Sequence, residues 1–124
     1  MTRVTFIIAA ALIATAALVV FVEGVLNPFT VWNLAPLAIA GLALWRGRGR
    51  ILAVALVFAL VTLVPIVYFH LAWLMDWDRI KTGSSTSALI FIFLPVYALV
   101  IGAVAALIAS LAMALFARFK NRAR

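Results

Sequence analysis

Side chains that could do chemistry gather in one stretch of the chain, residues 70–95, which reads "HLAWLMDWDRIKTGSSTSALIFIFLP". Its imidazole, His70, and its carboxylates, Asp76 and Asp78, are residue types that bind divalent metals, and Glu23 could join them from an earlier segment. On a straight helix, however, steps of about 100° per residue turn both aspartates away from His70. We therefore predict no metal site, and we expect His70 to lie at a membrane interface beside tryptophans.

The same stretch contains a run of hydroxyl side chains: Ser84, Ser85, Thr86 and Ser87. Such side chains cap helix starts by accepting hydrogen bonds from free backbone amides. Free amides also bind anions, and the cations Arg79 and Lys81 lie close by in the sequence. A phosphate or a lipid headgroup is therefore the alternative occupant, although capping is the simpler interpretation.

Catalysis by these residues is not expected. The chain has no G-x-S-x-G elbow, and its only histidine precedes the serines, so serine hydrolysis is not indicated. The absence of cysteine excludes thiolate catalysis, iron–sulfur clusters and cysteine-bound zinc. We predict a protein that is not an enzyme and that binds no cofactor.

The elements that must position these residues are long apolar runs. Hydrophobic residues make up 69% of the chain and charged residues only 10%, whereas charged residues make up about 25% of a typical soluble domain. An uncharged apolar run of about 18 residues can cross a bilayer as a helix. The predicted fold is all-α, an integral membrane four-helix bundle that forms a single domain over residues 1–124. The predicted helices cover about 4–22, 29–45, 51–75 and 88–117, joined by outer loops 23–28 and 76–87 and an inner loop 46–50.

The charges separate onto alternate connections between these runs. Both termini and the inner loop carry only cations, whereas the outer loops contain all three acids and only two cations. The positive-inside rule then places both termini in the cytoplasm, and we assign the chain to a bacterial inner membrane. The net charge of +7 does not indicate nucleic acid, because the basic residues flank apolar runs instead of forming one face of a soluble domain. The lipid bilayer is the predicted partner.

Small residues recur at every fourth position of the last predicted helix: Gly102, Ala106, Ser110 and Ala114. A ridge of this kind lets membrane helices approach closely, so it predicts packing inside the bundle. Self-association or contact with other membrane protein subunits is the alternative. The run itself is longer than a hydrocarbon core of about 30 Å requires, which predicts a tilt, a kink near Pro95 or a protruding end.

Three functions are compatible with this pattern. No acid, lysine or arginine lies near the middle of a predicted helix, which argues against a proton-coupled transporter. The leading prediction is a non-catalytic structural or accessory subunit of a membrane complex. The first alternative is a small oligomeric channel or transporter, in which Thr62, Tyr97 and Ser110 would face a common wet path. The second is a membrane module that binds a metal, an anion or a lipid headgroup at residues 70–87.

Overall fold

A computed structural model describes residues 2–25 and 27–122 of the chain. Residue 26 of the predicted outer loop 23–28 and the ends of the predicted domain 1–124 lie outside the described residues. Helices dominate the described part, which contains no strand, so the prediction of an all-α chain with four long helices is confirmed. In chain order the elements are α1 Arg3–Glu23, α2 Pro28–Arg46, α3 Arg50–Leu74, the short 3-10 turns η1 Trp77–Arg79 and η2 Ser87–Leu89, and α4 Ile90–Arg122.

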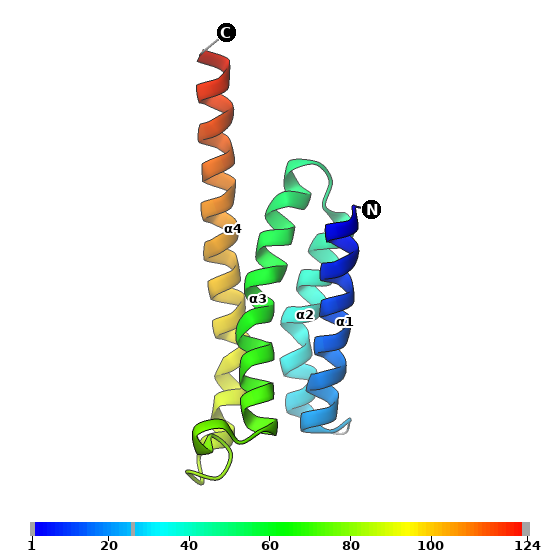
Figure 1. Cartoon of the computed structure of the whole chain (residues 1–124), viewed down its shortest axis with the longest axis vertical. Coiled ribbons are helices and arrows are strands. Elements are labelled where there is room, and N and C mark those ends of the chain that lie inside the picture. Colours follow the sequence, from blue (N-terminus) through cyan, green and yellow to red (C-terminus); the bar gives the residue numbers. More distant parts are fainter. Residues whose placement is uncertain (1, 26, 123–124) are drawn as a thin grey trace.

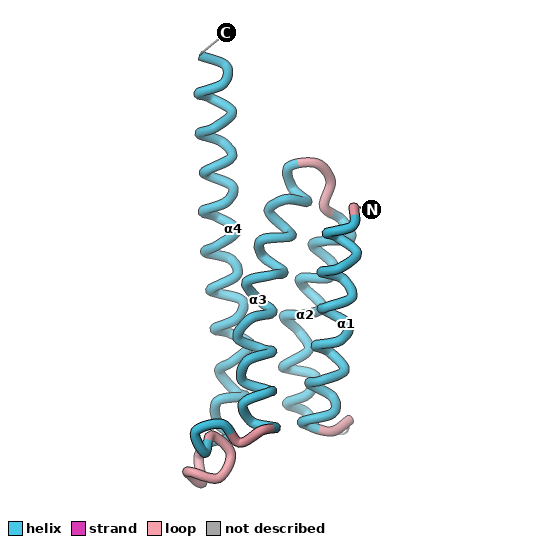
Figure 2. Tube along the Cα trace, in the orientation of Figure 1, coloured by secondary structure: helices cyan, strands magenta, loops and turns pink. Residues whose placement is uncertain are grey.

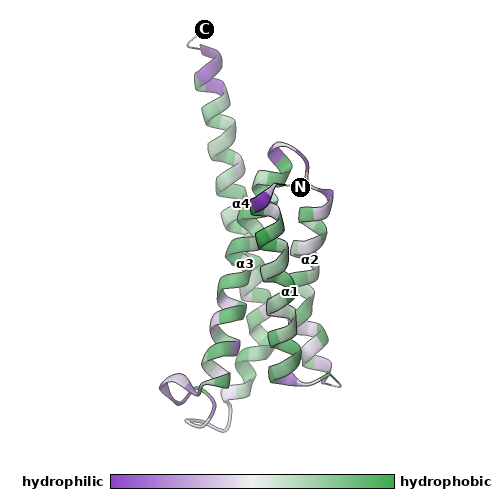
Figure 3. Ribbon diagram, turned by 45° about the vertical axis from the view of Figure 1, so that its right-hand side comes forward, coloured by the Kyte–Doolittle hydropathy of each residue, from purple (hydrophilic) through white to green (hydrophobic). Residues whose placement is uncertain are grey.

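All four α-helices are long and apolar enough to cross a membrane. Figure 3 shows hydrophobic residues along the length of the helices and hydrophilic residues mainly at their two ends. We call the end that carries Glu23, Asp76 and Asp78 the acidic end, and the end that carries Arg3 and residues 46–50 the basic end.

Local signals in the sequence explain where the helices begin and end. Thr2 caps α1 by accepting a hydrogen bond from the amide of Thr5 at 3.3 Å, and Asn27 caps α2 by accepting one from Phe29 at 3.0 Å. Pro28 occupies the first turn of α2, where its missing amide hydrogen is not needed. Gly24 follows the last residue of α1 and has a φ of +86°. Glycine adopts a positive φ without steric cost.

The four helices run side by side as an antiparallel bundle (Figure 1). α3 packs against each of the other three helices, and α2 also contacts both α1 and α4. α1 and α4 make no contact with each other within the described residues. The core therefore lies around α3, where Ala59, Thr62 and Ile66 are completely buried.

α4 is longer than its predicted extent, because it continues through the basic residues after Ala117 to Arg122. Its second half extends well past the other three helices (Figures 1 and 2). Arg50, the first residue of α3, donates a hydrogen bond from Nη2 to the carbonyl of Ser110 at 2.8 Å. The remaining helix has a mostly exposed, apolar surface that includes Leu111 and Leu115.

The small-residue ridge of α4 meets α3 at only part of its length. Gly102 is buried, and a Cβ atom there would overlap the Thr62 hydroxyl and lie 3.1 Å from the Phe58 ring. Ala106, Ser110 and Ala114 are only half-buried. Gly102 is thus the position at which α3 and α4 approach most tightly, whereas Ala114 lies beyond the Arg50–Ser110 contact.

Candidate functional site

The acidic end contains a buried pair of titratable side chains, Glu23 and His70, which joins α1 to α3. His70 Nε2 lies 2.8 Å from Glu23 Oε1, and the two side chains are 0% and 5% exposed, respectively. Glu23 is the last residue of α1, and its own carbonyl accepts a hydrogen bond from Asn27 Nδ2 at 3.3 Å. The next carbonyl, that of Gly24, accepts one from Thr30 at 2.6 Å. The tight turn between α1 and α2 therefore holds the carboxylate in place.

The hydrogen bonds of His70 require a proton between the two side chains. Nδ1 lies 2.8 Å from the carbonyl of Ile66, which can only accept, so Nδ1 carries a hydrogen. Nε2 would then face Glu23 Oε1 with lone pair against lone pair unless a proton lies between them. The bonded pair is either imidazolium with carboxylate or neutral imidazole with carboxylic acid. Both forms are neutral overall, and loss of that proton leaves one negative charge.

The second oxygen of the carboxylate is the unusual feature of this pair. Glu23 Oε2 is buried and has no hydrogen-bond partner among the described residues. A buried carboxylate oxygen without a partner is energetically unfavourable, and in native proteins such atoms call for an explanation. Glu23 also lines a pocket of about 240 Å³ between α1, α2, α3 and α4.

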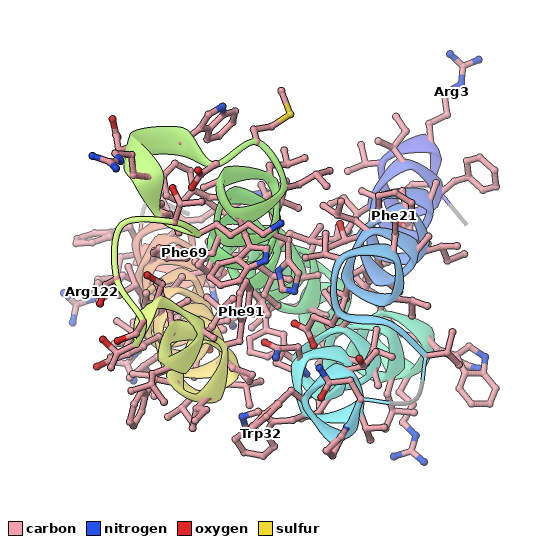
Figure 4. The ribbon with its side chains drawn as sticks, turned by 90° about the horizontal axis from the view of Figure 1, so that it is seen from below. Arg3, Phe21, Trp32, Phe69, Phe91 and Arg122 are labelled. Atoms are coloured by element: carbon pink, nitrogen blue, oxygen red, sulfur yellow. The ribbon has the colours of Figure 1, made fainter. Side chains whose placement is uncertain are left out.

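Aromatic rings form much of the wall of this acidic-end pocket. Phe29, Trp73 and Phe91 line it together with Glu23 and Asn27. The ring of Phe91 lies 5.1 Å from that of Trp73, nearly perpendicular to it, and 4.9 Å from the His70 imidazole. Viewed from the acidic end, Phe91 lies in the middle of the bundle (Figure 4). The pocket therefore combines one carboxylate with three aromatic side chains.

Asn33 and Pro95 shape the helix that carries Phe91. Pro95 has no amide hydrogen to donate to the carbonyl of Phe91, one turn earlier in α4. Asn33, which is fully buried in α2, donates from Nδ2 to this carbonyl at 3.0 Å and to that of Phe29 at 3.1 Å. Two carbonyl partners fix the orientation of its amide, and Oδ1 is buried with no hydrogen-bond partner among the described residues. A side chain of α2 thus supplies the hydrogen bond that Pro95 cannot donate in α4 and anchors the pocket wall.

The carboxylates of the loop after α3 lie apart from this pair. Asp76 accepts hydrogen bonds from the Thr82 hydroxyl at 2.6 Å and from the amides of Lys81 and Thr82 at 2.8 Å and 3.1 Å. Its pKa is lowered, chiefly by the Thr82 hydroxyl, since these donors favour the charged carboxylate. Asp76 therefore organises the loop that follows α3. Asp78 and Arg79 are exposed.

The hydroxyl run does not cap α4 through its side chains as expected. Thr86 makes no side-chain cap bond. Ser84 Oγ instead accepts from the Thr86 amide at 3.2 Å, and Ser87 donates to the carbonyl of Ser84 at 2.8 Å. Ser85 is exposed. These hydroxyls bond within the turn because the helix starts with a 3-10 turn, whose amides bond to Ser84 and Thr86 carbonyls.

The candidate residues named from the sequence thus separate into two groups. The structure brings together Glu23 and His70, and it leaves Asp76, Asp78, Arg79 and the hydroxyl run in the loop between α3 and α4. No group of three or more potential metal-ligating side chains forms within residues 2–25 and 27–122. His70 is completely buried within the bundle, because α1 ends beside it and presents Glu23.

Sequence reasoning missed Phe91, Trp73 and Asn33 as parts of this site. Trp73 is one of the tryptophans expected at the membrane interface beside His70, and Phe91 is one of many apolar residues in α4. A signal for Asn33 did exist, because Pro95 leaves a carbonyl in need of a donor and Asn33 is the only amide side chain inside a predicted membrane helix.

The polar side chains proposed for a channel do not line one path. Thr62 is completely buried against α4, whereas Tyr97 is 62% exposed. Ser110 is half-buried beside Arg50 near the basic end. This arrangement does not support the channel hypothesis.

Comparison with known proteins leaves the site as the only guide to function. The chain matches no protein-family model, no curated protein and no solved structure.

Proposed function

We propose that the chain is a non-catalytic, multi-pass membrane protein that binds a small organic cation in the acidic-end pocket. Two observations carry this proposal: Glu23 Oε2 is buried and has no hydrogen-bond partner among the described residues, and Glu23 lines a pocket together with Phe29, Trp73 and Phe91. An ammonium group could approach the carboxylate oxygen and lie against the aromatic faces, which attract cations. The C-terminal end of α1 carries a partial negative charge as well, so it adds to the attraction.

The donor set favours an organic cation over a metal ion. One carboxylate and one imidazole, whose two nitrogens are already hydrogen-bonded, are too few ligands for a divalent metal. Aromatic walls contribute no metal ligands, but they suit the apolar groups of an amine. The cavity of about 240 Å³ limits the ligand to a small molecule.

The charge distribution supports an orientation for this pocket. The basic end carries Arg3 and the arginines of residues 46–50, and the positive-inside rule places such an end in the cytoplasm. The proposed location is a cell inner membrane with both termini cytoplasmic, so that the pocket opens toward the outer side. Its ligand would then come from outside the cell.

The test uses choline and its uncharged analogue 3,3-dimethylbutan-1-ol, which has the same branched shape without the positive charge. Isothermal titration of the full-length protein in mild detergent should show choline binding at least tenfold tighter than the analogue. Glu23→Gln should weaken choline binding by tenfold or more, because the amide keeps the shape of the side chain and removes its charge.

Asp78→Asn is the matched control, because Asp78 is an exposed carboxylate at the same end that does not line the pocket. This variant should bind choline like the unchanged protein. Equal binding of choline and the uncharged analogue would contradict the proposal, as would full choline binding by a helical Glu23→Gln variant.

A second candidate function follows from α4. The end of α4 extends past the other described helices (Figure 1). Beyond the Arg50–Ser110 contact, its apolar residues such as Leu111 and Leu115 are exposed. Such a surface supports the role of an accessory subunit whose partner packs along the end of α4. Native mass spectrometry of the tagged protein, extracted from its own membrane, should then show a second protein in fixed ratio. A chain that carries no partner protein would contradict this role.

A further inference from the structure

A second cavity lies at the opposite end of the bundle from the acidic-end pocket. It is a groove of about 970 Å³ between α1 and α2 that reaches the turn before α3. Its lining is predominantly apolar and includes Leu12, Leu37 and Leu44. We call it the basic-end groove.

Small residues on facing helices create this groove. Ala9 and Ala16 line it from α1, and Ala38 and Gly41 line it from α2. A Cβ atom added at Gly41 would meet nothing within 4 Å. Helix pairs in membranes use small residues to approach closely, but none of the described side chains occupies the space at Gly41. The groove can therefore accept a flexible hydrocarbon chain.

Polar groups of the basic end lie at the mouth of the groove. Arg48 lines it together with Gly47, Gly49 and Thr2. Arg48 is exposed, and no ion pair involves it among the described residues. Trp45, which is 82% exposed, stands at the same mouth, where an indole ring suits the headgroup region. Arg46 and Arg50 lie two positions before and after Arg48 in the sequence and add to the positive charge at this end.

We propose that the basic-end groove binds one anionic phospholipid, with an acyl chain along Ala9, Ala38 and Gly41 and the headgroup phosphate at Arg48. An arginine beside an apolar channel complements a molecule that has a phosphate at one end and hydrocarbon at the other. Anionic lipids are favoured over zwitterionic ones because the mouth is purely cationic. This site is independent of the proposed cation pocket, since no residue lines both cavities.

The experiment is a native mass spectrometry titration of delipidated, full-length protein in detergent with phosphatidylglycerol or phosphatidylcholine. We expect one phosphatidylglycerol to bind at least fivefold tighter than phosphatidylcholine. Arg48→Gln should lower that affinity about fivefold, the effect of one basic residue at a membrane surface. Arg118→Gln is the matched control, because Arg118 is an exposed cation of α4 outside the groove and should leave the affinity unchanged.

A substitution that fills the groove distinguishes lipid binding in the groove from attraction of the headgroup to surface charge alone. Gly41→Leu places a side chain in the space that the acyl chain would occupy and should abolish binding of the single tight lipid. Ala10→Leu is the control, because Ala10 is exposed on α1 and does not line the groove. Equal affinity for the two lipids would overturn the proposal. Undiminished phosphatidylglycerol binding by Gly41→Leu would overturn it too, because headgroup attraction alone would then explain the binding.

Discussion

The two ends of this bundle handle charge in opposite ways. At the acidic end, Glu23 is buried against His70, and Asp76 is held by donors from its own loop. At the basic end, arginines 46, 48 and 50 are exposed and form no ion pair within the described part of the chain. The difference indicates that the acidic end is organised by contacts within the chain, whereas the charges of the basic end are available to molecules outside it.

The strongest test of this difference between the acidic and basic ends is to remove one member of the buried Glu23–His70 pair. His70→Ala would leave Glu23 buried without its partner, and breaking a buried pair in this way typically destabilises a protein by about 3–5 kcal/mol. Unfolding in mixed detergent, followed by circular dichroism, would measure the loss.

Two further variants make that result specific to the pair. Arg122→Gln at the basic end should change the unfolding free energy by less than about 0.5 kcal/mol, as surface substitutions usually do. A double variant, Glu23→Leu with His70→Phe, should recover part of the stability because it replaces the charges with apolar groups. A small loss for His70→Ala alone would show that the pair does not organise the acidic end.

The next largest effect comes from comparing two glycines, Gly102 at the α3–α4 contact and Gly41 in the basic-end groove. Gly102→Ala would force a Cβ atom against Thr62 and Phe58, and overpacking of this kind costs about 1–3 kcal/mol. Gly41→Ala in the basic-end groove meets nothing within 4 Å and should be neutral, or stabilising by up to about 1 kcal/mol through helix propensity. The same unfolding assay compares the two variants. Equal losses would show that the groove is as tightly packed as the α3–α4 contact.

Much of this architecture is predictable from the sequence, because hydrophobic run length alone determines which segments can cross a bilayer. The predicted helix boundaries near Glu23, Pro28 and Arg46 lie within about one residue of those observed, where glycine, proline and charge mark the ends. The extension of α4 to Arg122 was not predictable in this way, since a basic segment after an apolar run has the same composition whether or not it is helical.

The site was harder to predict because its residues come from all four helices. Glu23 and His70 are 47 positions apart, and which faces of α1 and α3 meet is decided by packing that a sequence pattern does not encode. The metal hypothesis had named Glu23 as a residue that could approach His70. The aromatic wall was not predictable, because Trp73 and Phe91 have the same residue types as exposed side chains near them, such as Trp77 and Phe93.

The smallest expected effect lies in the loop after α3. Thr82→Val removes the hydroxyl that contributes most to the lowered pKa of Asp76, so this pKa should rise toward its ordinary value of 3.8. A lowered carboxyl pKa stabilises the folded loop above about pH 4, and this contribution is lost as the pH falls through the folded-state pKa. Thr82→Ser keeps the hydroxyl and should leave the midpoint of Asp76 in an NMR titration unchanged. If Thr82→Val did not move that midpoint, the hydroxyl would not hold Asp76. The Glu23–His70 pair would then be the remaining evidence that contacts within the chain organise the acidic end.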